Sequence, residues 1–224
     1  MKISYQFRHN DKTLRDFEID IAKPAPPRPG KGEWTRLSRN KCANCTLRDD
    51  QVSHCPPAVD LEEVVDAFNE VISHEDVFVI VDINERHILK DGDAQSGLSA
   101  LMGLIMANSA CPVLGRLRGL TRTHTPFQSV EETLFRFIGA YYLGQMLEEK
   151  RGGQPDWSLD GLHALFDDLM VVNKAFKARI HSATRQDAAM NAISALAMHA
   201  LGAQLSLDDC EDELAEFAIQ PAAS

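Results

Sequence analysis

Hydrophobic and polar residues alternate along two short stretches near the start of the chain. Residues 2–8 and 14–21 show this period of two, which is typical of strands with one buried face. The residues from His9 to Lys12 favour a turn, so the two stretches predict a hairpin. A β-branched apolar run at 77–83 and a shorter partner at 86–90 predict two further strands. The first part of the chain therefore predicts an antiparallel sheet of about four strands.

One helix is expected within this strand-rich part. Asp60 is a good N-cap, and Glu63 follows three positions later, as in a capping box. Apolar side chains recur at helical spacing from Leu61 to Ile72. The sequence predicts that this helix begins at Asp60.

Helical periodicity dominates from about residue 93 onward. Ser129 and Glu132 form a second capping-box pattern, and Gly152 follows the end of the helix that they begin. Ser206 is a candidate cap for a last acidic helix. The expected helices cover residues 95–108, 112–120, 129–150, 158–181 and 186–203.

This order of elements predicts the α+β class, with an N-terminal antiparallel sheet of about four strands and one helix, followed by a helical bundle. We expect residues 1–224 to form a single unit. Within it, residues 1–92 are strand-rich and residues 93–205 form the helical bundle.

The segment 41–57 lacks apolar periodicity and has little beyond Leu47 and Val52 to bury. It also contains Cys42, Cys45 and Cys55. A segment without a hydrophobic core of its own needs another means of being held, and metal ligation is a common one. A Cys-x-x-Cys pair places two thiolates on one tight turn, in zinc sites and iron–sulfur sites alike. These three cysteines therefore predict a metal centre.

A fourth ligand has two candidates. Cys111 precedes Pro112, and proline favours the first position of a helix, where free N–H groups stabilise a thiolate. His54 is the alternative and would give a Cys3His zinc site, but its adjacency to Cys55 makes ligation by both awkward. We predict that Cys42, Cys45, Cys55 and Cys111 bind the cofactor.

An iron–sulfur cluster of the 4Fe-4S type is favoured over zinc. Structural zinc usually uses two similar knuckles, whereas the second pair of cysteines is widely separated here. Cys-Pro pairs such as Cys55-Pro56 recur around iron–sulfur clusters. We expect Leu101, Met102 and Ile105 to shield the centre from solvent. Cys210 has acidic neighbours that would raise its thiol pKa, so it is excluded from the site.

The charge, the apolar runs and the cysteines of the chain indicate where in the cell the protein works. The formal net charge of −10 disfavours nucleic-acid binding, despite basic residues at Arg116, Arg118 and Arg122. An apolar run long enough to span a membrane is not present, and the N-terminus reads as a strand and not as an export signal. Clustered cysteines in a reducing compartment indicate metal or redox chemistry more often than disulfides. We therefore expect a cytoplasmic location.

The runs Trp34–Leu37, Cys42–Leu47, His54–Leu61 and Ser109–Leu114 are similar to an uncharacterised bacterial family of about this length, a domain of unknown function. The resemblance implies that the four cysteines belong to one shared pattern. It implies no activity.

Three functions fit the sequence. The first is a metal-centre protein with a redox, sensing or structural role. The second is an oxidoreductase that uses the cluster or the Cys42/Cys45 dithiol, although no catalytic constellation decides whether the protein is an enzyme. The third is a zinc-stapled interaction module whose helical half binds a protein partner.

Overall fold

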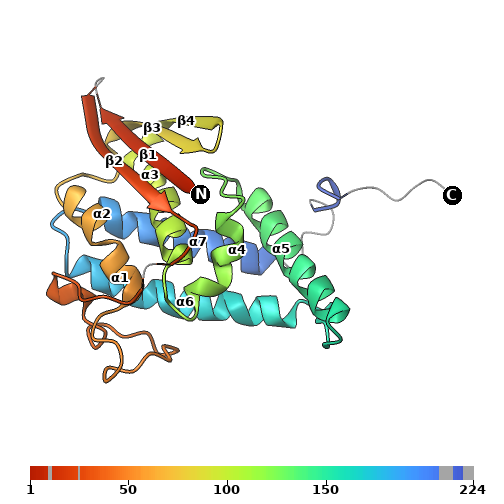
Figure 1. The fold of residues 1–224 in the computed structure, drawn as a ribbon. Coiled ribbons are helices and arrows are strands. Elements are labelled where there is room, and N and C mark those ends of the chain that lie inside the picture. Colours follow the sequence, from red (N-terminus) through yellow and green to blue (C-terminus); the bar gives the residue numbers. More distant parts are fainter. Residues whose placement is uncertain (10–11, 25, 207–213, 219–224) are drawn as a thin grey trace.

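The computed structural model describes residues 1–9, 12–24, 26–206 and 214–218 (Figure 1). One antiparallel sheet holds β1 (Lys2–His9), β2 (Lys12–Asp20), β3 (Asp76–Ile83) and β4 (Arg86–Asp93) in the order β2-β1-β3-β4. Helices follow the sheet along the chain. The predicted α+β class is therefore confirmed.

The sheet buries one face. On β1 the side chains of Ile3, Tyr5 and Phe7 are fully buried, whereas the residues between them reach solvent. The same alternation continues on β3, where Val79 and Val81 are buried. A strand that is half buried needs this period of two, so the sequence pattern specifies which face meets the helices.

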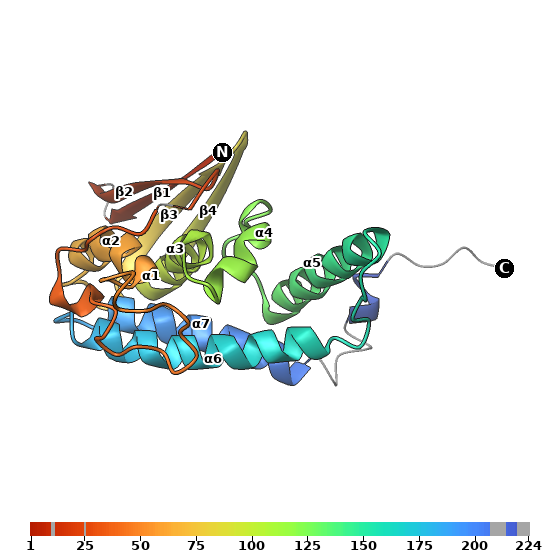
Figure 2. The ribbon, with the colours of Figure 1, turned by 60° about the horizontal axis from the view of Figure 1, so that its bottom comes forward.

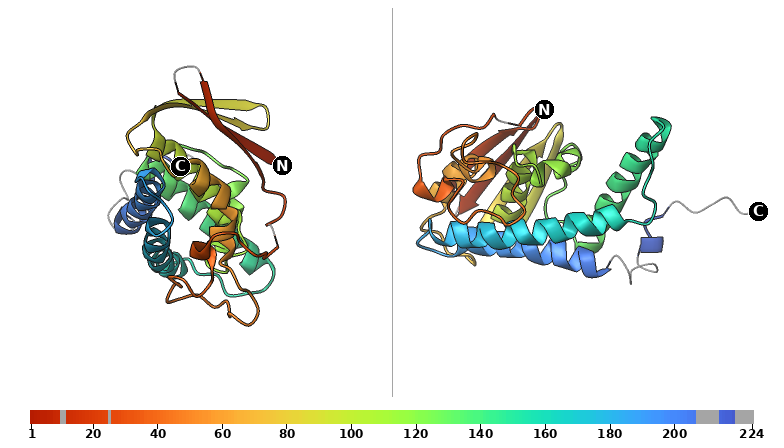
Figure 3. Two further views of the ribbon diagram at one scale, coloured as in Figure 1. Left: turned by 90° about the vertical axis from the view of Figure 1, so that its left-hand side faces the viewer. Right: turned by 90° about the horizontal axis from the view of Figure 1, so that it is seen from below.

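Helices cover the buried face. The 3-10 helix η1 (Glu33–Thr35) and helices α1 (Pro56–Asp60) and α2 (Glu62–Ala67) precede β3, and α3 (Ala94–Asn108) follows β4. Figures 1 and 3 show α3 between the sheet and α7, while α6 and α7 lie side by side in Figure 2. The later elements are the 3-10 helix η2 (Leu114–Leu117), α4 (Arg118–Thr121), α5 (Val130–Lys150), α6 (Asp160–His181) and α7 (Ala188–Ser206).

Gly97 lets α3 approach the sheet closely. A Cβ atom at this position would lie 2.6 Å from Phe7 Cε1 and 2.9 Å from Val79 Cγ2. Neither neighbour can move away freely, because both are buried in the core. Glycine at this position therefore sets the spacing between helix and sheet.

The structure corrects the expected start of the first helix. The helix begins at Pro56 with Cys55 as its N-cap, and Asp60 is the last residue of α1 instead of its cap. Asp60 forms an ion pair with Arg28 at 2.7 Å. The physical reason is Pro56, which has no N–H to leave unpaired and has a φ angle already suited to the first helical turn.

Other helix boundaries follow the sequence more closely. The predicted capping box at the start of α5 is confirmed, since Glu132 N donates to Ser129 Oγ at 3.1 Å and Ser129 N donates to Glu132 Oε2 at 2.9 Å. Gly152 has a φ of 83° just beyond the helix end. The expected helix at 112–120 is instead η2 followed by α4. The expected acidic helix after Ser206 falls largely at 207–213, outside the described residues.

Among the described helices, none combines the length and the apolar character that crossing a lipid bilayer requires.

Candidate metal centre

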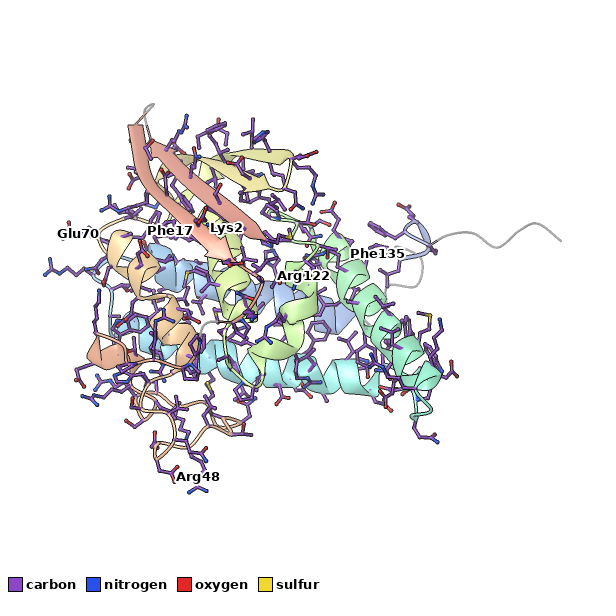
Figure 4. All side chains as sticks on the ribbon, viewed as in Figure 1. Lys2, Phe17, Arg48, Glu70, Arg122 and Phe135 are labelled. Carbon is purple, nitrogen blue, oxygen red and sulfur yellow. The ribbon has the colours of Figure 1, made fainter. Side chains whose placement is uncertain are left out.

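The cysteine-rich segment is a loop whose two ends are tied together. Arg36 and His54 form an isolated antiparallel bridge. Leu37 N donates to Ser53 O at 3.0 Å, and Cys55 N donates to Thr35 O at 2.7 Å. Figure 4 shows Arg48 at the outer edge of this loop, where its exposed side chain pairs with Asp50. The loop thus turns its charged side chains to solvent and buries few apolar ones.

Cys42 and Cys45 lie on a tight turn within this loop. Cys45 N donates to Cys42 O at 3.0 Å, which closes the Cys-x-x-Cys turn. Asn44, inside the turn, donates from Nδ2 to Asp168 Oδ1 at 2.9 Å and to Asp168 O at 3.1 Å. These hydrogen bonds attach the turn to α6.

Cys55 occupies the N-cap of α1 and is only 8% exposed. The nearby backbone N–H of Ala58 lowers the pKa of the Cys55 thiol, against the larger effect of burial. A helix N-terminus stabilises a thiolate because its first N–H groups have no partner within the helix. Pro56 and Pro57 fix the start of the helix but carry no N–H, so the first backbone N–H near the sulfur belongs to Ala58.

Cys111 has a similar setting on the far side of the loop. It follows α3, and the backbone N–H groups of Leu114 and Val113 hydrogen-bond to its thiol. Its own amide donates to Ser109 Oγ at 3.3 Å. Pro112 was expected at the first position of a helix, but the 3-10 helix η2 begins at Leu114 with Val113 as its N-cap, so Cys111 lies two positions before that cap.

All four cysteines line one cavity of about 20 Å³. Its apolar wall comes from Leu47, Val113, Val172 and Phe176. The expected shield of Leu101, Met102 and Ile105 does not line this cavity, because α3 turns the first two into the core between sheet and helices. His54 does not line it either, and its Nδ1 hydrogen-bonds to Ser53 Oγ at 2.8 Å.

Within the described ranges, no three His, Cys, Asp or Glu side chains already surround a single ion position. The shared cavity is the stronger observation, because a thiol changes its sulfur position by rotation about one bond without movement of the backbone. The backbone thus brings the four predicted ligands to the wall of one cavity, and metal binding by them stays a prediction.

Burial governs the protonation of these thiols. It raises the pKa of Cys42 to about 11, and the neighbouring Cys111 and Cys45 add to the rise. Burial likewise raises the pKa of Cys55 to about 12 and raises the pKa of Cys111. Thiolates that share an apolar cavity repel one another, so a bound cation would be needed to hold all four deprotonated.

Arg179 supplies a positive charge beside the cysteines. Its side chain, from α6, is 1% exposed. It donates from Nη1 to Trp34 O at 2.6 Å and to Arg36 O at 2.7 Å, and from Nη2 to Asn40 O at 3.4 Å. Its charge lowers the pKa of Cys55 and of Cys42 against the effect of burial. Among the described residues, Arg179 forms no ion pair with a carboxylate.

A buried cation without a counter-charge is costly, and the thiolates are the groups placed to balance it. Sequence reasoning did not single out Arg179. The sequence nevertheless contains a sign of its burial. Arg179 lies on the same helix face as the apolar residues Val172 and Phe176, and a basic residue on such a face is unusual.

The fold and site define an α+β protein with a small cysteine-lined cavity between a loop and its helices. A family model described as a domain of unknown function, DUF6901, matches residues 3–218, and the chain belongs to this family. No curated protein and no solved structure matches the chain significantly. The expected membership in a domain family of unknown function is confirmed, while a bacterial origin and a family-wide cysteine pattern stay predictions.

Proposed function

We propose that this protein is a cytoplasmic metal-centre protein in which Cys42, Cys45, Cys55 and Cys111 bind a 4Fe-4S cluster. The observation that carries the proposal is that four cysteines from separate segments line one apolar cavity beside the buried Arg179. A donor set of four thiolates fits both an iron–sulfur cluster and zinc. The cluster is preferred because the ligand spacing is uneven and because Cys55 and Cys111 each precede a proline.

The environment suits a negatively charged centre. Four thiolates outweigh the charge of one zinc ion or one cluster, so the loaded site would be anionic. Arg179 and the N–H groups near Cys55 and Cys111 offer positive charge and dipoles on that side. The same groups would strengthen the binding of the cofactor and would tune a redox potential if the centre holds iron.

We take a redox or sensing role as the proposed function of the centre. A purely structural role is the simpler alternative. In both, the centre ties the loop to the segment that follows α3, next to the α6 residues Val172 and Phe176. The alternative of an oxidoreductase that uses a free Cys42/Cys45 dithiol receives less support, because burial raises the pKa of Cys42 to about 11. A thiol with that pKa is a weak nucleophile at neutral pH.

The deciding experiment is anaerobic purification of the full chain, followed by a visible spectrum and measurement of iron, sulfide and zinc. A brown protein with comparable iron and sulfide contents supports the cluster. A colourless protein with about one zinc per chain supports the structural alternative. A folded, colourless protein free of both metals contradicts the proposal.

Single Cys→Ser variants test the ligand set. Cys42→Ser, Cys45→Ser, Cys55→Ser and Cys111→Ser are each expected to lower metal content. Cys210→Ser is the matched control, because this fifth cysteine was excluded from the site. If Cys210→Ser alone lowered metal content, or if none of the four did, the assignment would be wrong.

A further inference from the structure

A second and much larger cavity lies among the helices. Its volume is about 400 Å³, within the range of about 300–1,000 Å³ typical of small-molecule sites. Residues of α3, α5, α6 and α7 line it, together with the connection between α4 and α5. The cavity is partly open to solvent, so a small molecule could enter it from outside.

Small side chains create the space. Ala100, Gly103 and Ala107 of α3 line the cavity, and Ala195 and Ala200 of α7 line it as well. Larger apolar residues, including Leu104, Leu169 and Phe137, complete the wall. The surface offered to an occupant is therefore mainly apolar, with room where longer side chains would otherwise meet.

The lysine and arginine side chains that line this cavity are Lys90 and Arg136, and the histidines His124 and His199 line it as well. No Asp or Glu of the described chain lines it. The whole sequence has 33 acidic residues against 23 lysines and arginines, so these two charges have the sign opposite to the net charge of the chain.

Arg136 places a positive charge on the wall of this cavity. Its side chain is partly buried, donates from Nη1 to Gln128 Oε1, and donates from Nη2 to Leu120 O at 2.8 Å and Thr123 O at 2.9 Å. Its hydrogen-bond partners in the described part of the chain are all neutral, and none is a carboxylate. These bonds fix the guanidinium in place, and the described residues supply no counter-charge to it.

His124 adds a hydrogen-bonding group that carries no charge at neutral pH. Its Nε2 shares a hydrogen bond of 2.6 Å with the hydroxyl of the fully buried Tyr5. Burial lowers the pKa of His124 to about 4, and the charge of Arg136 contributes to the shift. The positive charge at this end of the cavity therefore belongs to Arg136.

We propose that this cavity binds a small, largely apolar carboxylic acid, with the carboxylate next to Arg136 and the apolar part against α3 and α7. The volume, the apolar wall, the unbalanced guanidinium and the absence of lining carboxylates each fit this class of ligand. A neutral apolar molecule would leave Arg136 without a counter-charge, and a cation would be repelled. The proposal does not depend on the metal centre.

The experiment is isothermal titration of the purified full chain with decanoate, decanol and decyltrimethylammonium at neutral pH, below their micelle-forming concentrations. Decanoate is expected to bind at about one molecule per chain. Decanol is expected to bind at least about tenfold more weakly than decanoate, because it lacks the charge that interacts with Arg136. The cationic amphiphile is expected not to bind.

Two variants separate the apolar and the charged parts of the site. Ala100→Phe fills the cavity and should abolish decanoate binding, whereas Ala178→Phe, at an exposed position of α6 outside the cavity, should leave it unchanged. Arg136→Gln should weaken decanoate about tenfold but leave decanol unchanged, a difference that a merely structural role of Arg136 would not produce. If Ala100→Phe fails to fold, Ala195→Leu fills the same cavity from α7.

The proposal is overturned if decanoate does not bind, if decanol binds as tightly as decanoate, or if the cavity-filling variants bind decanoate as well as the wild type does. Equal weakening of decanoate and decanol by Arg136→Gln would also overturn the assignment of the carboxylate to that residue.

Discussion

The guanidinium of Arg179 in α6 donates a hydrogen bond of 2.6 Å to the carbonyl oxygen of Trp34, 145 positions earlier in the chain. The same nitrogen also donates to Arg36 O at 2.7 Å. One buried side chain thus joins the last third of the chain to the start of the cysteine loop. This contact gives Arg179 two separable roles, one in the fold and one in the electrostatics of the candidate centre.

Replacement of Arg179 by glutamine is expected to lower the free energy of unfolding by about 2–4 kcal/mol, because buried carbonyl groups lose their donors. Chemical denaturation measures this loss. Arg185→Gln is the control, since Arg185 pairs with Glu70 on the surface, where Figure 4 shows Glu70 at the molecular edge. Its effect should stay within about 0.5 kcal/mol.

Arg179→Lys tests the charge separately. Lysine keeps the positive charge but not the planar fork that reaches several carbonyls. We expect this variant to lose stability as Arg179→Gln does but to retain more metal. Equal metal loss in both variants would show that the charge of Arg179 does not support the centre.

Removal of the metal is expected to open the cysteine loop first. The loop contains Arg39, Lys41 and Arg48, which are trypsin sites, and it buries few apolar side chains. Trypsin should therefore cut the chelated protein in this loop while the helical half resists, and the loaded protein should be cut more slowly. Mass spectrometry of the fragments locates the cuts. First cleavage within α6 or α7 would contradict this order of opening.

A pair of glycine variants tests the packing of α3 on the sheet. Gly97→Ala should destabilise the protein by about 1–3 kcal/mol, because the new methyl group overlaps Phe7 and Val79. Gly139→Ala is the matched control within α5, where an added Cβ would meet nothing within 4 Å. It should stabilise the protein by up to about 1 kcal/mol, since alanine favours the helix. Thermal unfolding measures both changes, with a lower melting temperature expected for Gly97→Ala and a higher one for Gly139→Ala.

Acid should destabilise the protein through His124. Burial lowers the folded-state pKa of His124 from 6.5 to about 4, so between these values the unfolded chain binds the proton more readily. Stability should therefore fall as the pH drops from about 6.5 to about 4, by at most about 3 kcal/mol from this residue. Denaturation at a series of pH values measures the slope.

His124→Gln should flatten that slope, because glutamine does not titrate. His87→Gln is the control, since His87 is exposed and pairs with Asp82 at the sheet edge. A slope in the His124→Gln variant equal to that of the wild type would assign the acid sensitivity to other groups.

The elements that the sequence predicts well are those whose own residues decide them. The sheet follows from alternation in β1 and β3, and the start of α5 follows from the Ser129/Glu132 capping box. The first helix was misplaced because Asp60 has the residue type of a cap, yet Pro56 begins the helix one turn earlier. Asp60 and Pro56 each favour a helix start at a different position, and the helix begins at Pro56 because proline suits the first helical turn.

The candidate site was predictable only in part for a different reason. The cysteine spacing names Cys42, Cys45, Cys55 and Cys111, and the structure places them around one cavity. Part of its apolar wall, Val172 and Phe176, and its buried cation come from α6, at positions that tertiary packing alone brings near residue 42. The second cavity could not be foreseen either, because alanine and glycine in a helix do not reveal whether a neighbour fills the space beside them.

The separation of the four cysteines along the chain has a consequence for biogenesis. During synthesis the first three emerge together, Cys111 follows more than fifty residues later, and the α6 wall that carries Phe176 and Arg179 comes later still. A cofactor delivered to the nascent chain would meet an incomplete and open set of ligands. Delivery after release would meet a finished cavity that the loop helps to enclose, so the loop would have to move aside for the cofactor to enter.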